Sequence, residues 1–218
     1  MTNITGTNQA YSPGANYSGL LYGAAGGGTT FTGLGGVDIM FGTGLNNTAD
    51  YSQDAANGGT AGIIAYLPSN FVQDGFGTYD YVSGIQNITG TASNDTIFGD
   101  TNANYLLGGV GNDYMSGGGG ADTIQGGLGS DLIYARAGNA TIISKSSDMA
   151  LGDADYFSGF HAGDMLNFSA DLQGKLIIVA GASSDVVIYA PVAGGFWYMD
   201  VANATLAQVN AAGVITYT

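Results

Sequence analysis

A nine-residue period from Gly90 to Ile143 constrains the fold of this 218-residue chain more than any other feature. Its rows read GTASNDTIF, GDTNANYLL, GGVGNDYMS, GGGGADTIQ, GGLGSDLIY and ARAGNATII. The sixth places of these rows are Asp95, Asn104, Asp113, Asp122, Asp131 and Ala140. The eighth places are all apolar: Ile97, Leu106, Met115, Ile124, Ile133 and Ile142. A fixed period of this kind indicates stacked structural units, each of which packs against its neighbours.

The positions within a row predict how each unit folds. Glycines at the first, second and fourth places allow a tight turn, and the last three places form a short extended segment. Alternation along that segment turns the eighth side chain inward and its neighbours outward. Two consecutive rows then make one coil. The fold class predicted is all-β, a right-handed parallel β-roll, with Tyr105, Tyr114, Leu132 and Tyr134 facing outward.

Stacking places the sixth residues of alternate rows on the same edge of the roll, about 4.8 Å apart. Asp95, Asp113 and Asp131 share one edge, and Asn104 and Asp122 share the other. Carboxylates beside glycine carbonyls are hard oxygen ligands, which suit calcium. We expect sites between Asp95 and Asp113, between Asp113 and Asp131, and a weaker one between Asn104 and Asp122.

The glycines of the turns complete the predicted metal ligands. The full set is Asp95, Asp100, Asn104, Gly108, Gly109, Gly111, Asp113, Gly117, Gly118, Gly120, Asp122, Gly126, Gly127, Gly129 and Asp131. Asp100 adds a ligand or only caps its own turn. A ladder of turns without calcium is the alternative. Each coil buries only about two apolar side chains, so folding is expected to depend on calcium.

The charge balance supports a cation and excludes some functions. All 17 acidic residues are Asp, only three residues are Lys or Arg, and the formal net charge is −14. Such a chain does not suit nucleic acid, and it repels itself unless a cation joins it. A merely solvated acidic face is the alternative. The absence of Cys and Glu, and the single histidine, His161, leave no recognisable catalytic set, so we expect no enzyme.

GGVGND, GGGGAD and GGLGSD resemble the nonapeptides of the RTX (repeats-in-toxin) calcium-binding family. Segments 33–52, 74–97 and 153–169 are similar to elements that flank such repeats in the family. The resemblance implies calcium in the turns, an extracellular or cell-surface location, and type I export through a C-terminal signal. The first twenty residues contain no apolar signal peptide, and no stretch is long enough to span a membrane.

Three regions are expected: a degenerate β or β-roll-like region at 1–80, the RTX roll at 81–152, and a β-rich cap with the secretion signal at 153–218. In the cap, 176–180, 185–190 and 195–201 favour antiparallel strands, and 202–213 favours one helix. Asp148 and Asp155 are open to a role in a last calcium site or in ordinary turns.

Two classes of function fit these features. The first is a secreted structural protein of the cell surface or matrix, which self-assembles as a homo-oligomer or polymer into an S-layer-like lattice or filament. The second is a calcium-dependent module that binds cell-surface polysaccharide or, less well, ice. A passive carrier for secretion is a third and weaker interpretation.

Overall fold

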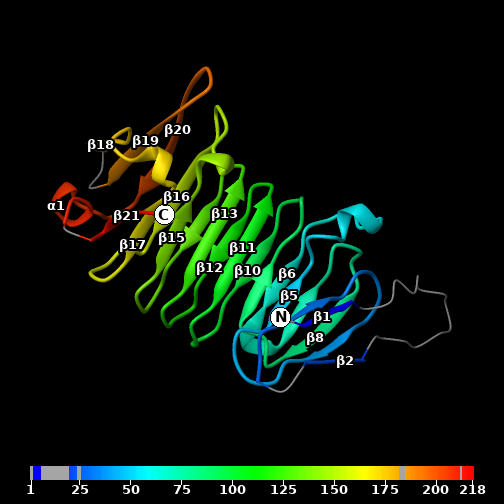
Figure 1. Cartoon of the computed structure of the whole chain (residues 1–218). Helices are drawn as coiled ribbons and strands as arrows, with labels where there is room; N and C mark the ends of the chain where they lie inside the picture. Colours follow the sequence, from blue (N-terminus) through cyan, green and yellow to red (C-terminus); the bar gives the residue numbers. More distant parts are fainter. Residues whose placement is uncertain (1, 6–19, 24–25, 182–184, 212) are drawn as a thin grey trace.

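The computed structural model describes residues 2–5, 20–23, 26–181, 185–211 and 213–218, which form two stacked sheets (Figure 1). The first sheet has nine strands, all parallel to their neighbours. In spatial order they are β1 (Thr2–Thr5), β3 (Thr29–Thr32), β5 (Thr48–Asp50), β9 (Asn87–Thr89), β11 (Tyr105–Val110), β13 (Thr123–Leu128), β15 (Thr141–Ser144), β17 (Met165–Phe168) and β21 (Ile215–Tyr217).

The second sheet has twelve strands and is parallel except at two places. In spatial order they are β18 (Ile177–Ala180), β19 (Val186–Val192), β20 (Gly195–Val201), β16 (Ala154–Ser158), β14 (Leu132–Tyr134), β12 (Tyr114–Ser116), β10 (Thr96–Phe98), β6 (Ile64–Tyr66), β7 (Phe71–Gln73), β8 (Tyr79–Ser83), β4 (Ile39–Phe41) and β2 (Leu20–Tyr22). The described helices are short: η1 (Ala55–Asn57), η2 (Leu67–Ser69), η3 (Ser146–Asp148), η4 (Ala170–Leu172) and α1 (Leu206–Val209).

The strand register has the predicted period of two rows per coil. Tyr114 pairs with Leu132 in the twelve-stranded sheet, and Tyr105 pairs with Thr123 in the nine-stranded sheet. The eighth-place side chains of both sheets are at most 1% exposed and belong to a single core between the sheets. The prediction of an all-β parallel roll is therefore confirmed.

The strand pairs depart from this period on both sides of the repeat segment. Thr48 pairs with Asn87, 39 residues on, because the chain between them adds an antiparallel β6–β7–β8 excursion to the twelve-stranded sheet. Leu132 pairs with Tyr156, 24 residues on, because the turn between them is longer than a repeat turn. The antiparallel strands expected in the tail form as β18, β19 and β20.

The helix expected over 202–213 is reduced to Leu206–Val209, so that expectation is wrong in extent. Asn203 has a φ of 57°, which a right-handed helix cannot include. The helix begins instead after Thr205, whose side chain accepts a hydrogen bond from the backbone N–H of Gln208. None of the described helices has the length and apolarity needed to span a bilayer.

Candidate calcium sites

Carboxylates of alternate rows form a ladder along one edge of the roll. The backbone N–H of Asp95 donates to Asp113 Oδ1 at 2.8 Å, and that of Asp113 donates to Asp131 Oδ1 at 2.9 Å. Each acceptor aspartate thus uses one carboxylate oxygen to accept a hydrogen bond from the backbone of the preceding coil. We call each of these hydrogen bonds between neighbouring coils a rung. The other edge has one rung within the repeats, in which the N–H of Asn104 donates to Asp122 Oδ1 at 3.0 Å.

In the repeat rungs, the second oxygen of three carboxylates is buried without a protein donor among the described residues. These atoms are Oδ2 of Asp113, Asp122 and Asp131, and the three residues are 1–2% exposed. A buried carboxylate oxygen with no partner is costly unless a cation or another donor compensates it. The three rungs therefore have the chemistry of incomplete cation sites.

The turn glycines leave room beside these oxygens. A methyl group on Gly108 would collide with Asp113 Oδ2 and would lie 2.5 Å from the carbonyl oxygen of Gly126 in the next coil. A carboxylate oxygen and a carbonyl oxygen thus border one small space that only glycine leaves open. The first-place glycines Gly117 and Gly126 face Asp122 Oδ2 and Asp131 Oδ2 in the same way.

The other predicted glycine ligands shape the turn. Gly109, Gly111, Gly118, Gly120, Gly127 and Gly129 all have φ between 93° and 129°, a region that side chains with a Cβ rarely adopt. At the second place of the last row Arg136 has a φ of 60°, and the conformation is kept there at a cost in strain.

Burial perturbs the ladder carboxylates strongly. Burial raises the pKa of Asp113 to about 8; the N–H of Asp95 opposes this rise, and the charges of Asp95 and Asp131 add to it. Burial likewise raises the pKa of Asp122 to about 7 and the pKa of Asp131 to about 6. A divalent cation would reverse these shifts, because it favours the ionised form.

The donor set fits calcium. Carboxylate and backbone carbonyl oxygens line the rungs, and the chain has no Cys. In the described part of the chain, no three His, Cys or Asp side chains group as a self-sufficient metal site, so each rung depends on backbone carbonyls. A bound calcium would supply the positive charge that holds two coils together. Asp113, Asp122 and Asp131, with their turn carbonyls, are the residues that would hold it.

Two predicted ligands have different surroundings. Asp95 Oδ2 accepts the N–H of Thr91 at 2.7 Å, so its second oxygen already has a donor. Asp100 is partly exposed and accepts the N–H and the side-chain amide of Asn102, both at 2.8 Å. Its carboxylate therefore closes its own turn and takes no part in the ladder.

Amides replace carboxylates on the N-terminal part of the second edge. Asn104 Nδ2 donates to the carbonyl of Gln86 at 2.8 Å. Asn47, which is fully buried, donates through Nδ2 to the carbonyls of Gly84 at 2.9 Å and Gly44 at 3.3 Å. A side-chain amide can thus give the turn carbonyls the partner that a cation would otherwise provide.

The ladder extends beyond the repeats to residues that the sequence analysis did not place in it. The N–H of Asp38 donates to Asp80 Oδ1 at 2.8 Å, and the N–H of Asp131 donates to Asp155 Oδ1 at 3.0 Å. On the second edge the N–H of Ala140 donates to Asp164 Oδ1 at 2.8 Å, so the series continues past Ala140. The signal was present in GLGGVD (33–38) and GFGTYD (75–80), but the two aspartates that end these segments lie 42 residues apart.

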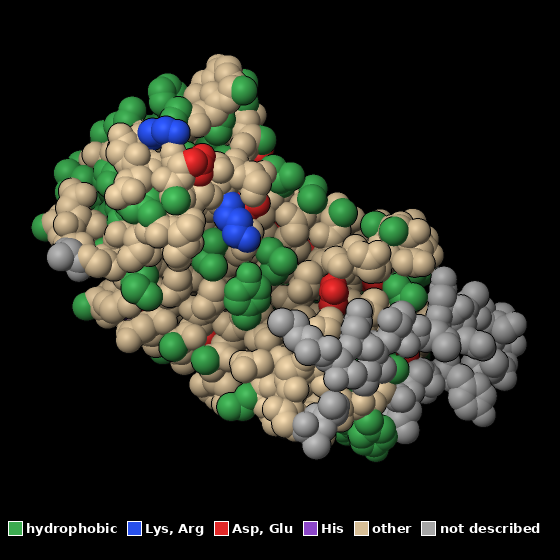
Figure 2. All heavy atoms as spheres, viewed as in Figure 1, with side chains coloured by type: hydrophobic (Ala, Val, Ile, Leu, Met, Phe, Trp, Pro, Cys, Tyr) green, Lys and Arg blue, Asp and Glu red, His purple; other side chains and the backbone are tan. Residues whose placement is uncertain are grey.

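Burial of aspartate is general in this protein. Ten of the seventeen aspartates are buried: Asp38, Asp54, Asp74, Asp80, Asp95, Asp113, Asp122, Asp131, Asp155 and Asp164. The face in Figure 2 accordingly shows few acidic atoms on a largely uncharged surface. Among the described residues one ion pair forms, between His161 Nδ1 and Asp164 Oδ2 at 3.0 Å. The described part of the protein therefore lacks internal cations for most of its buried acids.

The model of the RTX calcium-binding nonapeptide repeat matches residues 82–115 and 107–142. The chain carries RTX calcium-binding repeats. The matched RTX segment contains both carboxylate ladders of the central coils, and it ends before the enlarged turn that leads to Asp155. No curated protein sequence is significantly similar to the chain.

Two solved structures are similar in part to this chain. The crystal structure of extracellular lipase LipA from Serratia marcescens matches at 18% identity and a TM-score of 0.45, over 100% of this chain and 42% of the lipase. This chain therefore spans less than half the length of the lipase. The solution structure of the AlgE6R3 subunit of mannuronan C5-epimerase from Azotobacter vinelandii matches at 24% identity and a TM-score of 0.22, over 58% of this chain and 80% of that subunit.

Proposed function

We propose that this RTX protein is exported by the type I route, folds outside the cell when calcium fills its carboxylate rungs, and serves there as a structural, self-assembling protein. The observation that carries the calcium step is the set of buried carboxylate oxygens without protein donors, among the described residues, at Asp113, Asp122 and Asp131. Calcium at millimolar extracellular levels would fill weak sites that stay empty in the cytoplasm.

A calcium titration tests the folding step. We expect the far-ultraviolet circular dichroism of the full chain to change from unfolded to β-rich as calcium rises, with a steep midpoint, because stacked coils fold cooperatively. Magnesium at the same concentration controls for ionic strength. A chain that folds equally well in excess EGTA, and takes up no calcium in equilibrium dialysis, would contradict the proposal.

The support for self-assembly lies at the ends of the twelve-stranded sheet. β18 is an edge strand, and Ile177 and Val179 in it are 48% and 38% exposed. The strand contains no charged residue. An apolar edge strand without charge is a template for strand addition. β2 is the edge at the opposite end, so contact between different ends would propagate without closing.

Light scattering in calcium tests this assembly. We expect particles that grow with concentration and dissociate in EGTA. Val179→Lys should abolish growth while leaving the calcium midpoint unchanged, because a lysine on the edge blocks pairing. Leu151→Lys, at an exposed residue outside β18, is the matched control. Monodisperse monomer in saturating calcium would refute the self-assembly proposal.

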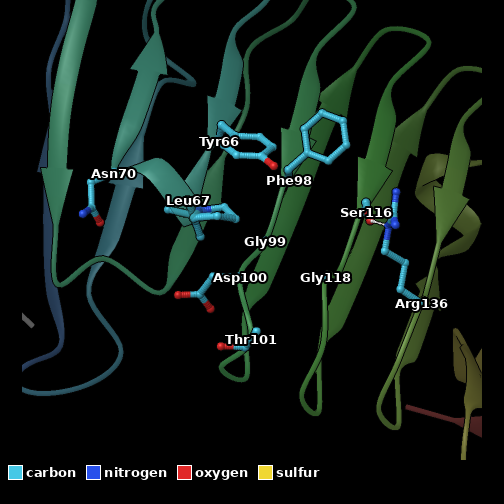
Figure 3. A pocket seen from close by; sticks show the side chains of 11 residues that line it. Tyr66, Leu67, Asn70, Phe98, Gly99, Asp100, Thr101, Ser116, Gly118 and Arg136 are labelled. Carbon is cyan, nitrogen blue, oxygen red and sulfur yellow. Dashed lines mark hydrogen bonds between the residues drawn. The ribbon is translucent and has the colours of Figure 1, made fainter.

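A second candidate, polysaccharide binding, is favoured by a groove on the outer face of the twelve-stranded sheet (Figure 3). The groove has a volume of about 520 Å³. Tyr66 and Phe98 stand side by side in it, with ring centroids 5.4 Å apart. Asp100 and Arg136 line the same groove, and Arg136 Nε donates to Ser116 Oγ at 2.8 Å. Aromatic faces beside polar groups suit the stacking and hydrogen bonding of sugars.

Affinity electrophoresis in gels containing soluble polysaccharides, with calcium, tests this candidate. Tyr66→Ala should remove retardation, whereas Tyr105→Ala, on the opposite sheet, should not. Absence of retardation across neutral and acidic polysaccharides would eliminate the candidate.

The proposal involves no catalysis. His161 is 45% exposed and is engaged with Asp164. A hollow of about 220 Å³ beside it is lined, among the described residues, by no Ser, Thr or Cys that could act as a nucleophile.

A further inference from the structure

Arg136 is the single arginine of the chain, and it lines the groove on the outer face of the twelve-stranded sheet (Figure 3). It occupies the second place of the last nine-residue row, where the three preceding rows have Gly109, Gly118 and Gly127. Its φ is 60°, a left-handed conformation that is strained for a residue with a Cβ. Glycine would adopt this conformation without strain. Folding of the turn therefore does not explain the arginine, and strained residues of this kind gather at functional sites.

The guanidinium of Arg136 is fixed on one side and available on the other. Its Nε donates to Ser116 Oγ at 2.8 Å, and Ser116 is 1% exposed on the neighbouring strand β12. Arg136 itself is exposed. Within the described part of the chain its terminal nitrogens have no acceptor and it forms no ion pair. A positioned fork of N–H donors without a protein partner suits a planar carboxylate, which it binds through two parallel hydrogen bonds.

A glycine keeps the groove open between Arg136 and Asp100. Asp100, Gly118 and Arg136 follow the ends of β10, β12 and β14 by two residues each, so they lie in this order on consecutive coils (Figure 3). A Cβ on Gly118 would lie 2.4 Å from the carbonyl oxygen of Asp100, so no side chain fits there. Asp100 is therefore two strand spacings from Arg136, or roughly 10 Å. This separation, and the bonds of Asp100 to its own turn, leave the cation to a ligand.

Aromatic rings continue from the groove along the sheet. The ring centroids of Tyr66 and Phe98 are 5.4 Å apart, those of Phe98 and Tyr114 are 5.5 Å apart, and those of Tyr114 and Tyr134 are 5.5 Å apart. These four residues lie on the adjacent strands β6, β10, β12 and β14. The line of rings thus reaches the strand that precedes Arg136. Aromatic faces stack on sugar rings, so a line of them suits an extended sugar chain.

We propose that the groove binds an acidic polysaccharide that contains uronate sugars. Arg136 binds a uronate carboxylate, and the rings from Tyr66 to Tyr134 stack on the neighbouring sugars. This inference rests on the polysaccharide-binding candidate and names its ligand class. Single-stranded nucleic acid also combines rings with negative charge, but it needs a positive groove that follows its whole backbone. Among the described residues that line this groove, Arg136 is the single cation, in a chain of net charge −14.

A pair of matched ligands tests the inference. End-labelled hexagalacturonate is compared with the same hexamer after reduction of its carboxyl groups to give galactose. Their binding to the full chain in saturating calcium is measured by fluorescence anisotropy. We expect hexagalacturonate to bind at least about tenfold more tightly than the reduced hexamer, because a charge-assisted hydrogen bond is lost on reduction. This preference should shrink as salt is raised.

Arg136→Gly should make the two hexamers bind equally, while calcium-dependent folding by circular dichroism is retained, since glycine relieves the positive φ. Arg136→Lys should keep a smaller preference, because lysine retains the charge without the fork. Lys175→Gln, which removes one charge at an exposed residue outside the groove, is the matched control and should behave as the wild type.

Three outcomes would overturn the inference: a preference that survives Arg136→Gly, equal binding of oligothymidylate, or tighter binding of a sulfated oligosaccharide. If both hexamers bind equally and Tyr66→Ala weakens both, the acidic ligand class is wrong and the polysaccharide candidate stands. If no oligosaccharide binds, both are wrong. The calcium titration reports the folding proposal separately, so these failures are distinguishable.

Discussion

The two edges of the roll close the same kind of turn in different ways. On the first edge the ladder residues are aspartates, at Asp38, Asp80, Asp95, Asp113, Asp131 and Asp155. On the second edge the N-terminal rungs use the amides of Asn47, Gln86 and Asn104, and carboxylates come later. An amide carries its own donor, whereas a carboxylate only accepts and needs a protein donor or a cation beside it. The comparison teaches that calcium dependence is distributed unevenly over the fold.

The largest expected effect is that of pH on the protein in EGTA. The pKa of unfolded Asp is about 3.9. Burial raises the folded pKa values to about 8 at Asp113, 7 at Asp122 and 6 at Asp131. Folding without calcium therefore takes up protons, and stability present near pH 4 is lost as pH rises through 6 to 8. Circular dichroism in EGTA should show more folded protein at pH 5 than at pH 8.

With saturating calcium the trend should reverse, because calcium requires the ionised carboxylates. The amide edge does not titrate, so it provides no such response. A chain whose folding in EGTA is independent of pH between 5 and 8 would show that the carboxylate edge is already compensated.

The next largest effect is expected for Asp113→Ala. It removes the acceptor for the N–H of Asp95 and the oxygen that borders the space beside Gly126. We expect a loss of about 2–4 kcal/mol in the free energy of unfolding at tenfold saturating calcium, from one orphaned donor and one lost ion. Urea denaturation measures it. Asp171→Ala should stay within about 0.5 kcal/mol of the wild type.

A smaller effect is expected when a carboxylate is moved to the amide edge. Asn47→Asp replaces the donor to the carbonyls of Gly84 and Gly44 by an acceptor. We expect a loss of about 1–3 kcal/mol at low calcium that shrinks as calcium rises, since the ion can take the place of the lost N–H. Urea denaturation at two calcium concentrations measures this. Asn46→Asp, at the exposed neighbouring residue, is the control. Equal effects of the two variants would contradict the conclusion that the Asn47 amide takes the place of a cation on the second edge.

The smallest effect is expected for Asn104→Asp. The variant loses the bond to the Gln86 carbonyl but gains a charge opposite Asp122. These changes oppose each other, so we expect the unfolding free energy in calcium to change by about 1 kcal/mol or less. Isothermal titration calorimetry should nevertheless show tighter calcium binding on this edge. Weaker binding would mean that the amide rung is not a substitute for a calcium rung.

The repeat region was predictable in detail because its contacts obey a fixed spacing. The side chains at place eight form the core, and the residues at place six form the hydrogen-bond ladder. Residues two rows apart pair between neighbouring strands. None of these needs knowledge of distant residues. The assignment of individual calcium ligands and the division at 80 and 152 stay predictions.

The sequence could not show which oxygens already have donors. The N–H of Thr91 donates to Asp95 Oδ2, and the N–H of Asn102 donates to the carboxylate of Asp100. The repeat motif does not distinguish these aspartates from the others. Tyr51 donates to Asp80 Oδ2 at 3.0 Å across 29 residues. Such contacts depend on side-chain packing from neighbouring coils, which no local pattern encodes.

The sequence by itself determined the parallel coil, its inward-facing core and the acidic edge, because each follows from a residue's place in a nine-residue row. Only the tertiary structure decided that Asp38 meets Asp80 across 42 residues and that Asp131 meets Asp155 across an enlarged turn. The reason is geometric. A coil can contain an added strand excursion or a longer turn while its strands still pair in register with the next coil. Spacing along the chain therefore no longer measures distance along the roll.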